Sequence, residues 1–394
     1  MHEPKDESDE GASNRHRKAV VIGGAGFLGK RLVTMLGGGD GSFVPPQQWP
    51  RFDHVHVLDR APYFEDPHAK QQRETRGIGI SSATGDIRTK DDLRNALRGA
   101  HTVFHLASLV DVGLRRNPAI EEINVVGTRN VIEVCQELGI PFLVYTSTED
   151  VVFSETPVSG GDESLPYPSK PLHDYVRTKI EGERAVRAAD GERGLRTCAI
   201  RPVHIYGPDD PHAMIQSLEA FAERRVPFLL GNGSARFDVV HVDNVAHAHL
   251  LAAAKLHDPA TCNQVGGRVY FTGEGHAPNY FEFLRPFAEA SGIVMPRVRL
   301  PGPVVLLLAQ AMELVHRVTG AEVPFHRFHY HILVKDFFFS NANAERDLGY
   351  APVVSKEEGM AQTIEWVRTL TISSCFASDL GPPSPQNLHP RNGL

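Results

Sequence analysis

A tyrosine and a lysine four residues apart carry the strongest chemical signal in this sequence. Tyr175 and Lys179 lie in a segment with helical spacing, so their side chains share one helix face about one turn apart. Free tyrosine, with a pKa of about 10, is a poor base at neutral pH, but an adjacent ammonium lowers that pKa by ~1–3 units. The pair predicts a tyrosine that accepts an alcohol proton while hydride leaves the same carbon. A surface pair formed by chance is the alternative.

Hydroxyl side chains close the apolar run that precedes this helix. The run 142–145 predicts a buried strand, and Thr146, Ser147 and Thr148 follow it. In an open α/β sheet, side chains at the carboxyl ends of strands face the ligand crevice. We therefore expect Thr148, or Ser147 beside it, to orient the substrate oxygen and to stabilise the charge that develops there.

A glycine-rich turn near the N-terminus predicts the cofactor that would take the hydride. Residues 19–29, AVVIGGAGFLG, have the pattern of a strand, a tight turn and a helix. Gly23 permits the turn, Gly26 lets backbone N–H groups approach a pyrophosphate, and Gly29 lets the helix pack closely on the strand. The segment therefore predicts a nicotinamide dinucleotide site, with Lys179 also able to hold the nicotinamide ribose.

An acid at the end of the second predicted strand indicates which dinucleotide is bound. The alternating run 54–58 ends in Asp59, whose carboxylate can accept hydrogen bonds from the adenosine ribose and would repel a 2′-phosphate. Asp59 thus favours NAD over NADP. Arg60 follows immediately and could pair with that phosphate instead, and a solvated acid at a strand end is the third interpretation.

The order of periodic segments predicts an α/β fold. The segment 79–97 is expected to hold a short strand and then a helix that starts near Asp91, and further strands are expected at 102–105 and 197–200 with a helix over 121–137. Together these predict a Rossmann-type doubly wound parallel sheet with a smaller C-terminal lobe. We expect an NAD-binding domain over 18–208 that also carries the tyrosine and lysine. Residues 209–370 would form mainly a substrate-binding lobe, with some segments returning to the first domain. The charged arm 1–17 and the proline-rich tail 371–394 are expected to be disordered.

Composition excludes several classes of protein. The 394 residues have a net charge of −7, with basic residues scattered among acids, so nucleic acid is not an expected partner. The four cysteines stand singly, which is typical of reduced thiols in a cytoplasmic protein. His326, His329 and His331 have no acidic or thiol partner nearby in the sequence, so no metal is expected. The oligomeric state stays open, with a homodimer as one prediction.

The most lipophilic run, 300–315, is interrupted by Pro301, Pro303, Gln310 and Glu313. It is shorter than the ~20 apolar residues that span a bilayer, so a transmembrane helix is not expected. We predict a helix packed in the C-terminal lobe. A helix that lies at the interface of an internal membrane is the alternative.

Longer motifs resemble one branch of the extended short-chain dehydrogenases. The G-x-x-G-x-x-G spacing and the Y-x-x-x-K pair are superfamily features. The segments 145–153 (YTSTEDVVF), 161–170 (GDESLPYPSK), 195–208 (LRTCAIRPVHIYGP), 237–253 (FDVVHVDNVAHAHLLAA) and 340–350 (SNANAERDLGY) resemble the 3β-hydroxysteroid dehydrogenase family, including its sterol-4α-carboxylate 3-dehydrogenases. Two departures are Ile22 in place of a usual threonine and Thr148 in place of a common serine, which preserves the hydroxyl.

The resemblance implies further site residues. It places Asp86 at the adenine, His105 to Ser108 as a loop over the cofactor, and Asn124 as a support of the active site by hydrogen bonds. An acid in an Asx-turn and a helix-surface amide are the alternatives for Asp86 and Asn124. The expected cofactor contacts are then Gly23, Gly26, Phe27, Leu28, Gly29, Asp59, Arg60, Asp86, Ile87, Leu106, Ala107, Tyr175, Lys179 and Pro202. The expected catalytic residues are Tyr175, Lys179, Thr148, Ser147 and Asn124.

The family resemblance also implies an activity, which is NAD-dependent oxidation of a ring hydroxyl, the 3β-hydroxyl of a steroid or sterol-like molecule. A nucleotide-sugar epimerase or dehydratase is the first alternative, because extended members share the same cofactor residues. A catalytically silent NAD-binding scaffold is the second. The intact Tyr175 and Lys179 argue against a silent protein, and the apolar 300–335 region lacks the arginine-rich character expected for binding of a pyrophosphate sugar.

Overall fold

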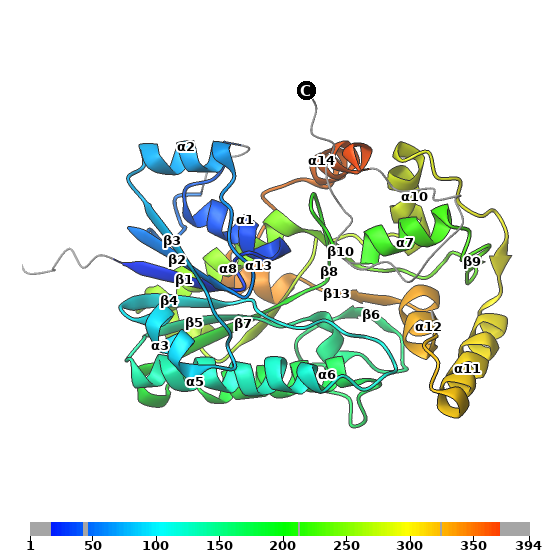
Figure 1. Cartoon of the computed structure of the whole chain (residues 1–394), viewed down its shortest axis with the longest axis horizontal. Coiled ribbons are helices and arrows are strands. Elements are labelled where there is room, and N and C mark those ends of the chain that lie inside the picture. The colour runs from blue at the N-terminus through cyan, green and yellow to red at the C-terminus, as the bar shows by residue number, and fades with distance from the viewer. Residues whose placement is uncertain (1–16, 42–45, 212, 324, 371–394) are drawn as a thin grey trace, which may run out of the picture.

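A parallel β-sheet lies at the centre of the computed structural model, which describes residues 17–41, 46–211, 213–323 and 325–370 (Figure 1). The predicted disordered arm, apart from Arg17, and the predicted tail lie outside the described residues. The seven strands are β1 (Lys18–Ile22), β2 (His54–Asp59), β3 (Gly79–Thr84), β4 (Ala100–His105), β5 (Phe142–Thr146), β7 (Arg196–Pro202) and β11 (Val269–Thr272). This confirms the predicted α/β fold.

The strand order is β11-β7-β5-β4-β1-β2-β3, and every pair is parallel. The order reverses between β1 and β4, and open α/β sheets bind ligands outside the carboxyl ends of the strands at such a reversal. The glycine turn follows β1, and the loop that the resemblance places over the cofactor follows β4. The topology therefore brings these two segments together.

Helices cover both faces of the sheet, as its strongly apolar strands require. α1 (Phe27–Leu36) packs against α8 (Val242–His257) on one face (Figure 1). α3 (Lys90–Leu97), α5 (Thr128–Glu137) and α6 (Asp174–Ala188) lie on the other. α8 and β11 come from beyond residue 208, so segments from the second half of the chain complete the sheet layer.

A second apolar core lies beside the sheet and includes Met214, Leu284 and Phe287. Its helices are α7 (Ala213–Ala222), α10 (Tyr280–Ala290), α11 (Gly302–Thr319), α12 (Arg327–Val334) and α14 (Lys356–Thr369). Three short parallel pairs extend toward it, namely β8 (His204–Tyr206) with β10 (Val239–His241), β9 (Leu229–Leu230) with β12 (Arg299–Leu300), and β6 (Val158–Gly161) with β13 (Phe337–Phe339). The smaller elements are α2 (Pro67–Thr75), α4 (Pro118–Glu121), α9 (Cys262–Val265), α13 (Ala342–Leu348) and the 3₁₀ segments η2 (Glu149–Val152) and η3 (Glu192–Gly194).

The helix predicted over 121–137 is not continuous. α4 ends at Glu121, a π-helical segment, η1, covers Glu122–Gly127, and α5 begins at Thr128. π-Helical turns interrupt α-helices mostly at functional sites. The wider turn contains the buried Asn124, whose side-chain amide hydrogen-bonds with the neighbouring loop.

Candidate active site

The glycine turn joins β1 to α1 through contacts that leave no room for side chains. Gly23 has a φ of +88°, and a Cβ there would lie 2.7 Å from the backbone nitrogen of Ala107. A Cβ on Gly29 would lie 2.0 Å from the Gly23 carbonyl oxygen, so α1 packs directly on the turn. α1 begins at Phe27 with Gly26 as its N-cap; no side chain caps it, and no acid stands in its first turn. This positive helix end fits a pyrophosphate.

Backbone hydrogen bonds fix the loop after β4 beside this turn. Leu106 N and Ala107 N both donate to the carbonyl oxygen of Ile22, at 2.9 and 3.0 Å. Leu28, on the first turn of α1, is buried. Pro202 ends β7 at the same carboxyl edge of the sheet. These four predicted cofactor contacts, Leu28, Leu106, Ala107 and Pro202, thus come from three segments that meet at the carboxyl ends of the strands.

Asn124 anchors the far end of that loop. Its Nδ2 donates to Leu109 O at 2.9 Å, and its Oδ1 accepts from Leu109 N at 2.8 Å. Nδ2 also lies 3.2 Å from Thr178 Oγ1 on α6. With 1% of its surface exposed, Asn124 is not the helix-surface amide of the alternative interpretation. It ties the loop to the helix that carries the tyrosine and lysine.

Asp59 stands against the glycine turn. Its Oδ2 accepts from Ala25 N at 2.9 Å, and its Oδ1 accepts from Ala61 N at 3.0 Å. Two backbone donors therefore orient the carboxylate at the end of β2. A carboxylate in this position can accept hydrogen bonds from the ribose hydroxyls, as the sequence predicts.

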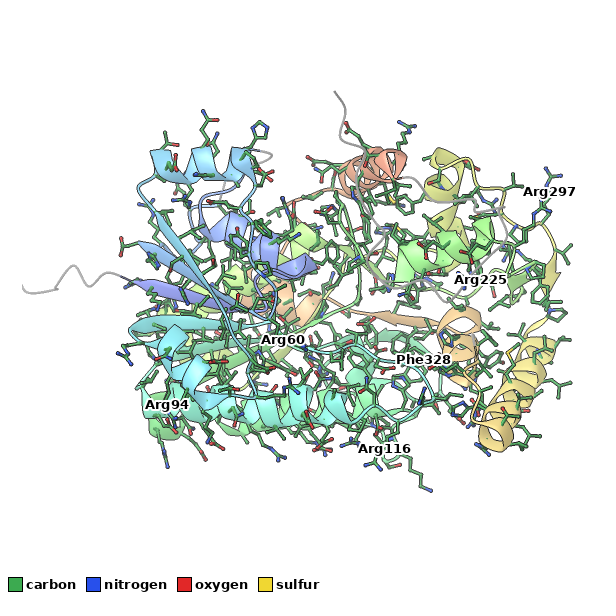
Figure 2. The ribbon with its side chains drawn as sticks, viewed as in Figure 1. Arg60, Arg94, Arg116, Arg225, Arg297 and Phe328 are labelled. Atoms are coloured by element: carbon green, nitrogen blue, oxygen red, sulfur yellow. The ribbon has the colours of Figure 1, made fainter. Side chains whose placement is uncertain are left out.

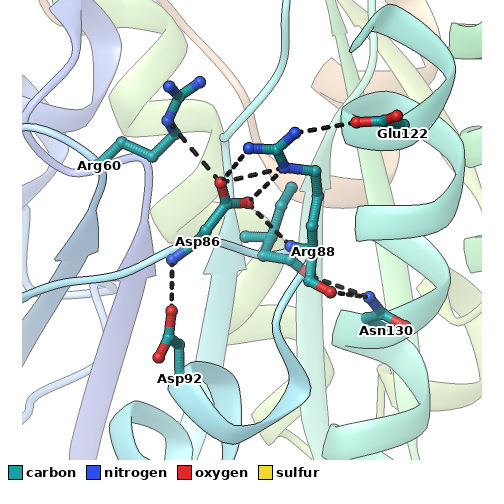
Figure 3. Close-up of polar contacts among 7 residues, drawn as sticks. Arg60, Asp86, Arg88, Asp92, Glu122 and Asn130 are labelled. Carbon is teal, nitrogen blue, oxygen red and sulfur yellow. Dashed lines mark hydrogen bonds and ion pairs between the residues drawn. The ribbon is translucent and has the colours of Figure 1, made fainter. Parts of the chain in front are cut away.

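Asp86 faces two arginines (Figure 3). Arg88 Nη2 and Nε donate to Asp86 Oδ2 at 2.7 and 3.0 Å, and Arg60 Nε lies 3.8 Å from the same oxygen. These hydrogen bonds hold the pKa of Asp86 below its usual range. The backbone N–H of Arg88 donates to Asp86 Oδ1 at 2.9 Å, which forms the Asx-turn of the alternative interpretation. Ile87, which stands between them in the sequence, is buried, and its carbonyl accepts from Asn130 Nδ2 at 3.1 Å.

Tyr175 and Lys179 both lie buried on the first turns of α6. Their exposed fractions are 7% and 2%. Lys179 Nζ donates to Thr146 O at 2.7 Å and lies 4.6 Å from the centre of the Tyr145 ring. Burial lowers the pKa of Lys179 to about 7, against the opposing charge of Glu183. The burial of both side chains excludes the surface pair of the alternative interpretation.

The pKa of Tyr175 moves in the direction opposite to the sequence expectation. Burial, followed by the charges of Asp150 and Glu149, raises the pKa of Tyr175 well above its usual value, while a hydrogen bond with Thr148 lowers it. The expectation considered only the ammonium of Lys179, which the structure directs at a backbone carbonyl and an aromatic ring. Burial is the main cause of the shift, and the charges of the two acids beside Thr148 add to it.

The structure separates the two candidate hydroxyls. Ser147 Oγ donates to Glu183 Oε2 at 2.5 Å, within a buried ion pair in which Arg201 Nη2 lies 2.6 Å from Glu183 Oε1. The Ser147 hydroxyl therefore hydrogen-bonds within this ion pair. It is not placed to orient the substrate oxygen instead of Thr148, which was the alternative interpretation of the sequence. Thr148 instead caps η2, where its Oγ1 accepts from Asp150 N at 3.2 Å.

Sequence reasoning missed the carboxyl groups of Glu149 and Asp150, which follow Thr148 directly on η2. Thr148 Oγ1 lies 3.1 Å from Glu149 Oε2 and 3.4 Å from Asp150 Oδ2. Burial is the main cause that raises the pKa of both groups, of Asp150 to about 7. The signal was present in the sequence, because two adjacent acids that follow the hydroxyl residues at the end of an apolar strand are unusual in a predicted crevice.

The second lobe reaches the tyrosine through aromatic rings. The rings of His173 and Tyr175 stack with centres 6.2 Å apart, and Phe328 of α12 meets His173 edge-on at 4.5 Å. Figure 2 shows Phe328 at the junction of the two lobes. Burial lowers the pKa of His173 to about 4, so its ring is neutral at physiological pH. His173 and Phe328 form a wall of rings beside Tyr175.

Comparison with known proteins identifies the family. A sequence profile of the 3-beta hydroxysteroid dehydrogenase/isomerase family matches residues 20–302, more than half of the chain. The chain belongs to this family. A 3beta-hydroxysteroid-dehydrogenase/decarboxylase of Arabidopsis thaliana is 33% identical, covering 89% of this chain and 79% of the relative. The human sterol-4-alpha-carboxylate 3-dehydrogenase, decarboxylating, is 31% identical, and the match covers 91% of this chain and 90% of the relative.

A bacterial member of the 3-beta hydroxysteroid dehydrogenase/isomerase family is equally similar. The 3 beta-hydroxysteroid dehydrogenase/Delta 5-->4-isomerase of Mycobacterium tuberculosis is 32% identical, covering 90% of this chain and 91% of the relative. The matched region contains the glycine turn, Asp59, Thr148 and the Tyr175–Lys179 pair, whereas α11 begins where the match ends. The candidate active site therefore lies within the matched region.

Solved structures agree on the fold. MoeE5 in complex with UDP-glucuronic acid and NAD aligns with a TM-score of 0.63 at 25% identity, covering 89% of this chain and 99% of that one. The crystal structure of gox2253 aligns with a TM-score of 0.67 at 24% identity, and the match covers 89% of this chain and 97% of that one. These two solved structures thus share the architecture of this chain.

Proposed function

We propose that this protein oxidises the 3β-hydroxyl of a steroid or sterol-like substrate, with NAD as hydride acceptor. One observation carries the proposal, which is that Tyr175, Lys179 and Thr148 lie together and buried at the carboxyl edge of the sheet. The names of the relatives supply the substrate class, since those reported above are named as dehydrogenases acting at position 3 of steroids or sterols.

The residues of the nucleotide site fit NAD. The uncapped N-terminus of α1 suits its pyrophosphate, and the carboxylate of Asp59 suits an adenosine ribose without a 2′-phosphate. Arg60 is paired with Asp86 and is mostly exposed, so it does not offset the charge of Asp59 at the turn. When bound, NAD supplies the acceptor for the hydride that leaves the carbinol carbon.

Residues of the protein itself orient the substrate, accept its proton and hold the cofactor. Thr148 donates to or accepts from the substrate oxygen and holds it beside the Tyr175 hydroxyl. Tyr175 accepts the proton of the substrate alcohol as the carbonyl forms. Lys179 holds the nicotinamide ribose with its ammonium donors, and Asn124 keeps the loop over the cofactor in register with α6.

Activity on a panel of alcohols tests this function. Purified protein would be incubated with NAD and, separately, with 3β-hydroxysteroids, 4α-carboxylated sterols and nucleotide sugars, while NADH absorbance is followed. We expect NADH formation with a 3β-hydroxysteroid or sterol acid. Turnover of a nucleotide sugar alone would favour the epimerase or dehydratase alternative, and absence of any NADH would favour the silent scaffold.

We further propose that α11 docks on an anionic membrane surface. No helix among the described residues is long and apolar enough to cross a bilayer. On α11, Val305, Ala309 and Glu313 are buried, and Glu313 pairs with Arg327 at 2.9 Å. The opposite face carries a stripe of exposed apolar side chains at helical spacing, namely Val304, Leu307, Leu308, Leu314, Val315 and Val318. Such a helix matches the interfacial alternative of the sequence.

Charge complementarity favours a lipid surface for this face. Arg317 on α11 and Arg115 in the loop 111–118 have side chains 70% and 78% exposed. Arg116 and His316 line a common hollow at the C-terminal end of α11, and Figure 2 shows Arg116 on the lower side of the molecule, where α11 also lies. Basic side chains beside an apolar stripe attract anionic headgroups. A second copy of the chain, the predicted homodimer, is the competing occupant.

A further inference from the structure

A buried carboxylate follows the catalytic pair along α6. Glu183 lies one turn beyond Lys179 on the same helix face, and its side chain is buried. Its Oε2 accepts from Ser147 Oγ at 2.5 Å and from Arg201 Nε at 2.9 Å. Its Oε1 accepts from Arg201 Nη2 at 2.6 Å and from Tyr167 Oη at 2.5 Å. The carboxylate therefore joins α6 to the end of β5, to β7 and to the segment between β6 and α6.

The hydrogen bonds of Lys179 and Glu183 fall on adjacent residues of the strand end. Lys179 Nζ donates to Thr146 O at 2.7 Å, and Glu183 accepts from Ser147, the next residue. Thr148 follows directly and caps η2. Two successive turns of α6 are thus fixed to two successive residues at the end of β5. A displacement of Glu183 would therefore move the lysine relative to the strand end that carries Thr148.

Glu183 also carries the negative charge that acts on the ammonium. Burial lowers the pKa of Lys179 to about 7, and the charge of Glu183 opposes this shift. The other titratable groups around the ammonium are neutral at pH 7, since burial raises the pKa of Tyr145 on β5 and burial with the charge of Lys179 lowers that of His105 on β4 to about 3. Burial raises the pKa of Glu183 itself, but the hydrogen bonds and charge of Arg201 on β7 outweigh burial and hold it below its usual value.

We propose that Glu183 is a positioning residue for Lys179, and that its carboxylate fixes α6 to the end of β5 so that the ammonium meets the nicotinamide ribose. Ser147 and Arg201 hold the carboxylate in turn. The charge of Glu183 favours the protonated lysine, which is the form that has three donors for the ribose hydroxyls. The inference rests on the proposed NAD-dependent function, in which Lys179 binds the ribose.

A positioning role must be separated from the contribution of the ion pair to stability. Removal of one partner of a buried ion pair leaves an uncompensated charge, which destabilises a fold whatever the pair does for function. Replacement of both partners by uncharged residues avoids that penalty. A positioning role also predicts a change in the pH dependence of NAD binding, which a purely structural role does not.

The experiment measures the dissociation constant for NAD against pH by fluorescence titration, and stability by chemical denaturation. In the wild type, affinity should fall as pH rises and Lys179 loses its proton. In Glu183→Gln we expect NAD binding to weaken about tenfold at neutral pH, as loss of a hydrogen bond from a charged group does. The midpoint of the pH dependence should move to lower pH, because the ammonium loses its neighbouring anion.

Two further variants of the same helix frame this result. Glu183→Asp keeps the charge and should return the midpoint toward that of the wild type. Glu181→Gln is the matched control, since Glu181 lies on α6 but pairs with Arg177 at 2.8 Å on the outer side of the helix. The control should retain wild-type NAD affinity and the wild-type midpoint. An unchanged affinity and midpoint in Glu183→Gln would overturn the proposal.

The double variant Glu183→Gln with Arg201→Met decides between the two roles, and it does so even if Glu183→Gln alone does not fold. It should regain stability, because no unpaired charge remains, but should keep the weak NAD binding and the lower midpoint. Wild-type NAD affinity in the double variant would make the ion pair purely structural. Ser147→Ala keeps the ion pair and should still weaken NAD binding, so wild-type affinity there would contradict the link to β5.

Oxidation of a 3β-hydroxysteroid is followed separately with the same variants. A wild type that binds NAD but oxidises no 3β-hydroxysteroid would remove the proposed substrate and leave the NAD results for Glu183 standing. Wild-type NAD binding by Glu183→Gln, together with oxidation by the wild type, would remove the role of Glu183 alone.

Discussion

The Asp59 carboxylate is held by two backbone N–H groups, from Ala25 and Ala61, before any cofactor arrives. Its orientation therefore costs little conformational entropy on binding. A 2′-phosphate placed on the adenosine ribose would bring like charges together at the glycine turn. Arg60, the only cation that follows the strand directly, is engaged with Asp86 at 3.8 Å.

We predict that the protein binds NAD more tightly than NADP by about tenfold or more, which corresponds to about 1.4 kcal/mol. Asp59→Asn removes the repulsion of the 2′-phosphate while an oxygen acceptor remains, so the preference for NAD over NADP should become smaller. Titration by intrinsic fluorescence measures both affinities, and Arg60→Gln serves as the comparison variant. Equal or tighter binding of NADP by the wild type would mean that Arg60 governs this end of the site.

Sequence alone predicted the candidate catalytic residues but not their surroundings. Tyr175, Lys179 and Asn124 could be found because their spacing or motif is local. The pKa of Tyr175 could not be predicted, since it depends on burial and on Glu149 and Asp150, which act through space. The role of Ser147 was open for the same reason. Its partner Glu183 lies 36 positions away, and only the packing of α6 on β5 brings them together.

At the scale of elements, α1 depends on its glycines for contact with β1. The hypothetical Cβ of Gly29 falls 2.0 Å from a backbone oxygen, which cannot move without opening the turn. At the other end of α1, a Cβ on Gly37 would meet its neighbours at 3.4 Å or more, which is ordinary contact.

Gly29→Ala should therefore weaken NAD binding by tenfold or more and destabilise the fold by about 1–3 kcal/mol, as overpacking does. Gly37→Ala should leave the NAD affinity and the stability of the fold nearly unchanged, and it serves as the control. NAD titration and chemical denaturation of the two variants supply the measurements. Wild-type NAD affinity in Gly29→Ala would contradict the close packing of helix on turn.

Element boundaries were predicted where hydrophobic periodicity was strong and were missed where tertiary contacts decide them. The strands β1, β2, β4 and β5 followed from their apolar runs. β11 was not singled out, because its four residues, Val269–Thr272, are too short to stand out within the second half of the chain. The π-helical turn around Asn124 has no periodic signal of its own.

At the scale of the whole molecule, the sheet layers and the second lobe present different surfaces. The proposed nucleotide site lies at the carboxyl ends of the strands, whereas α11 stands at the outer side of the second lobe (Figure 1). A docked α11 would let the protein collect a lipophilic substrate from a bilayer without crossing it.

We predict that the protein cosediments with vesicles that contain anionic lipid and that added salt weakens this binding. Leu307→Ser with Leu314→Ser removes two side chains that are 66% and 61% exposed, and should abolish cosedimentation. Val294→Ser, at a residue 85% exposed outside α11, is the matched control. Binding that survives the double change would contradict docking through α11. A dimer that the double change converts to monomers, without vesicle binding by the wild type, would assign the face to a second copy.

Replacement of Tyr175 by phenylalanine tests the central claim most directly, because it removes only the phenolic oxygen. With a 3β-hydroxysteroid as substrate, we expect Tyr175→Phe to lose ~10²–10⁴-fold in kcat while its affinity for NAD stays close to that of the wild type. Lys179→Ala should lose both turnover and NAD affinity, since the ammonium is assigned to the ribose. A Tyr175→Phe variant that keeps most of its activity would contradict the mechanism.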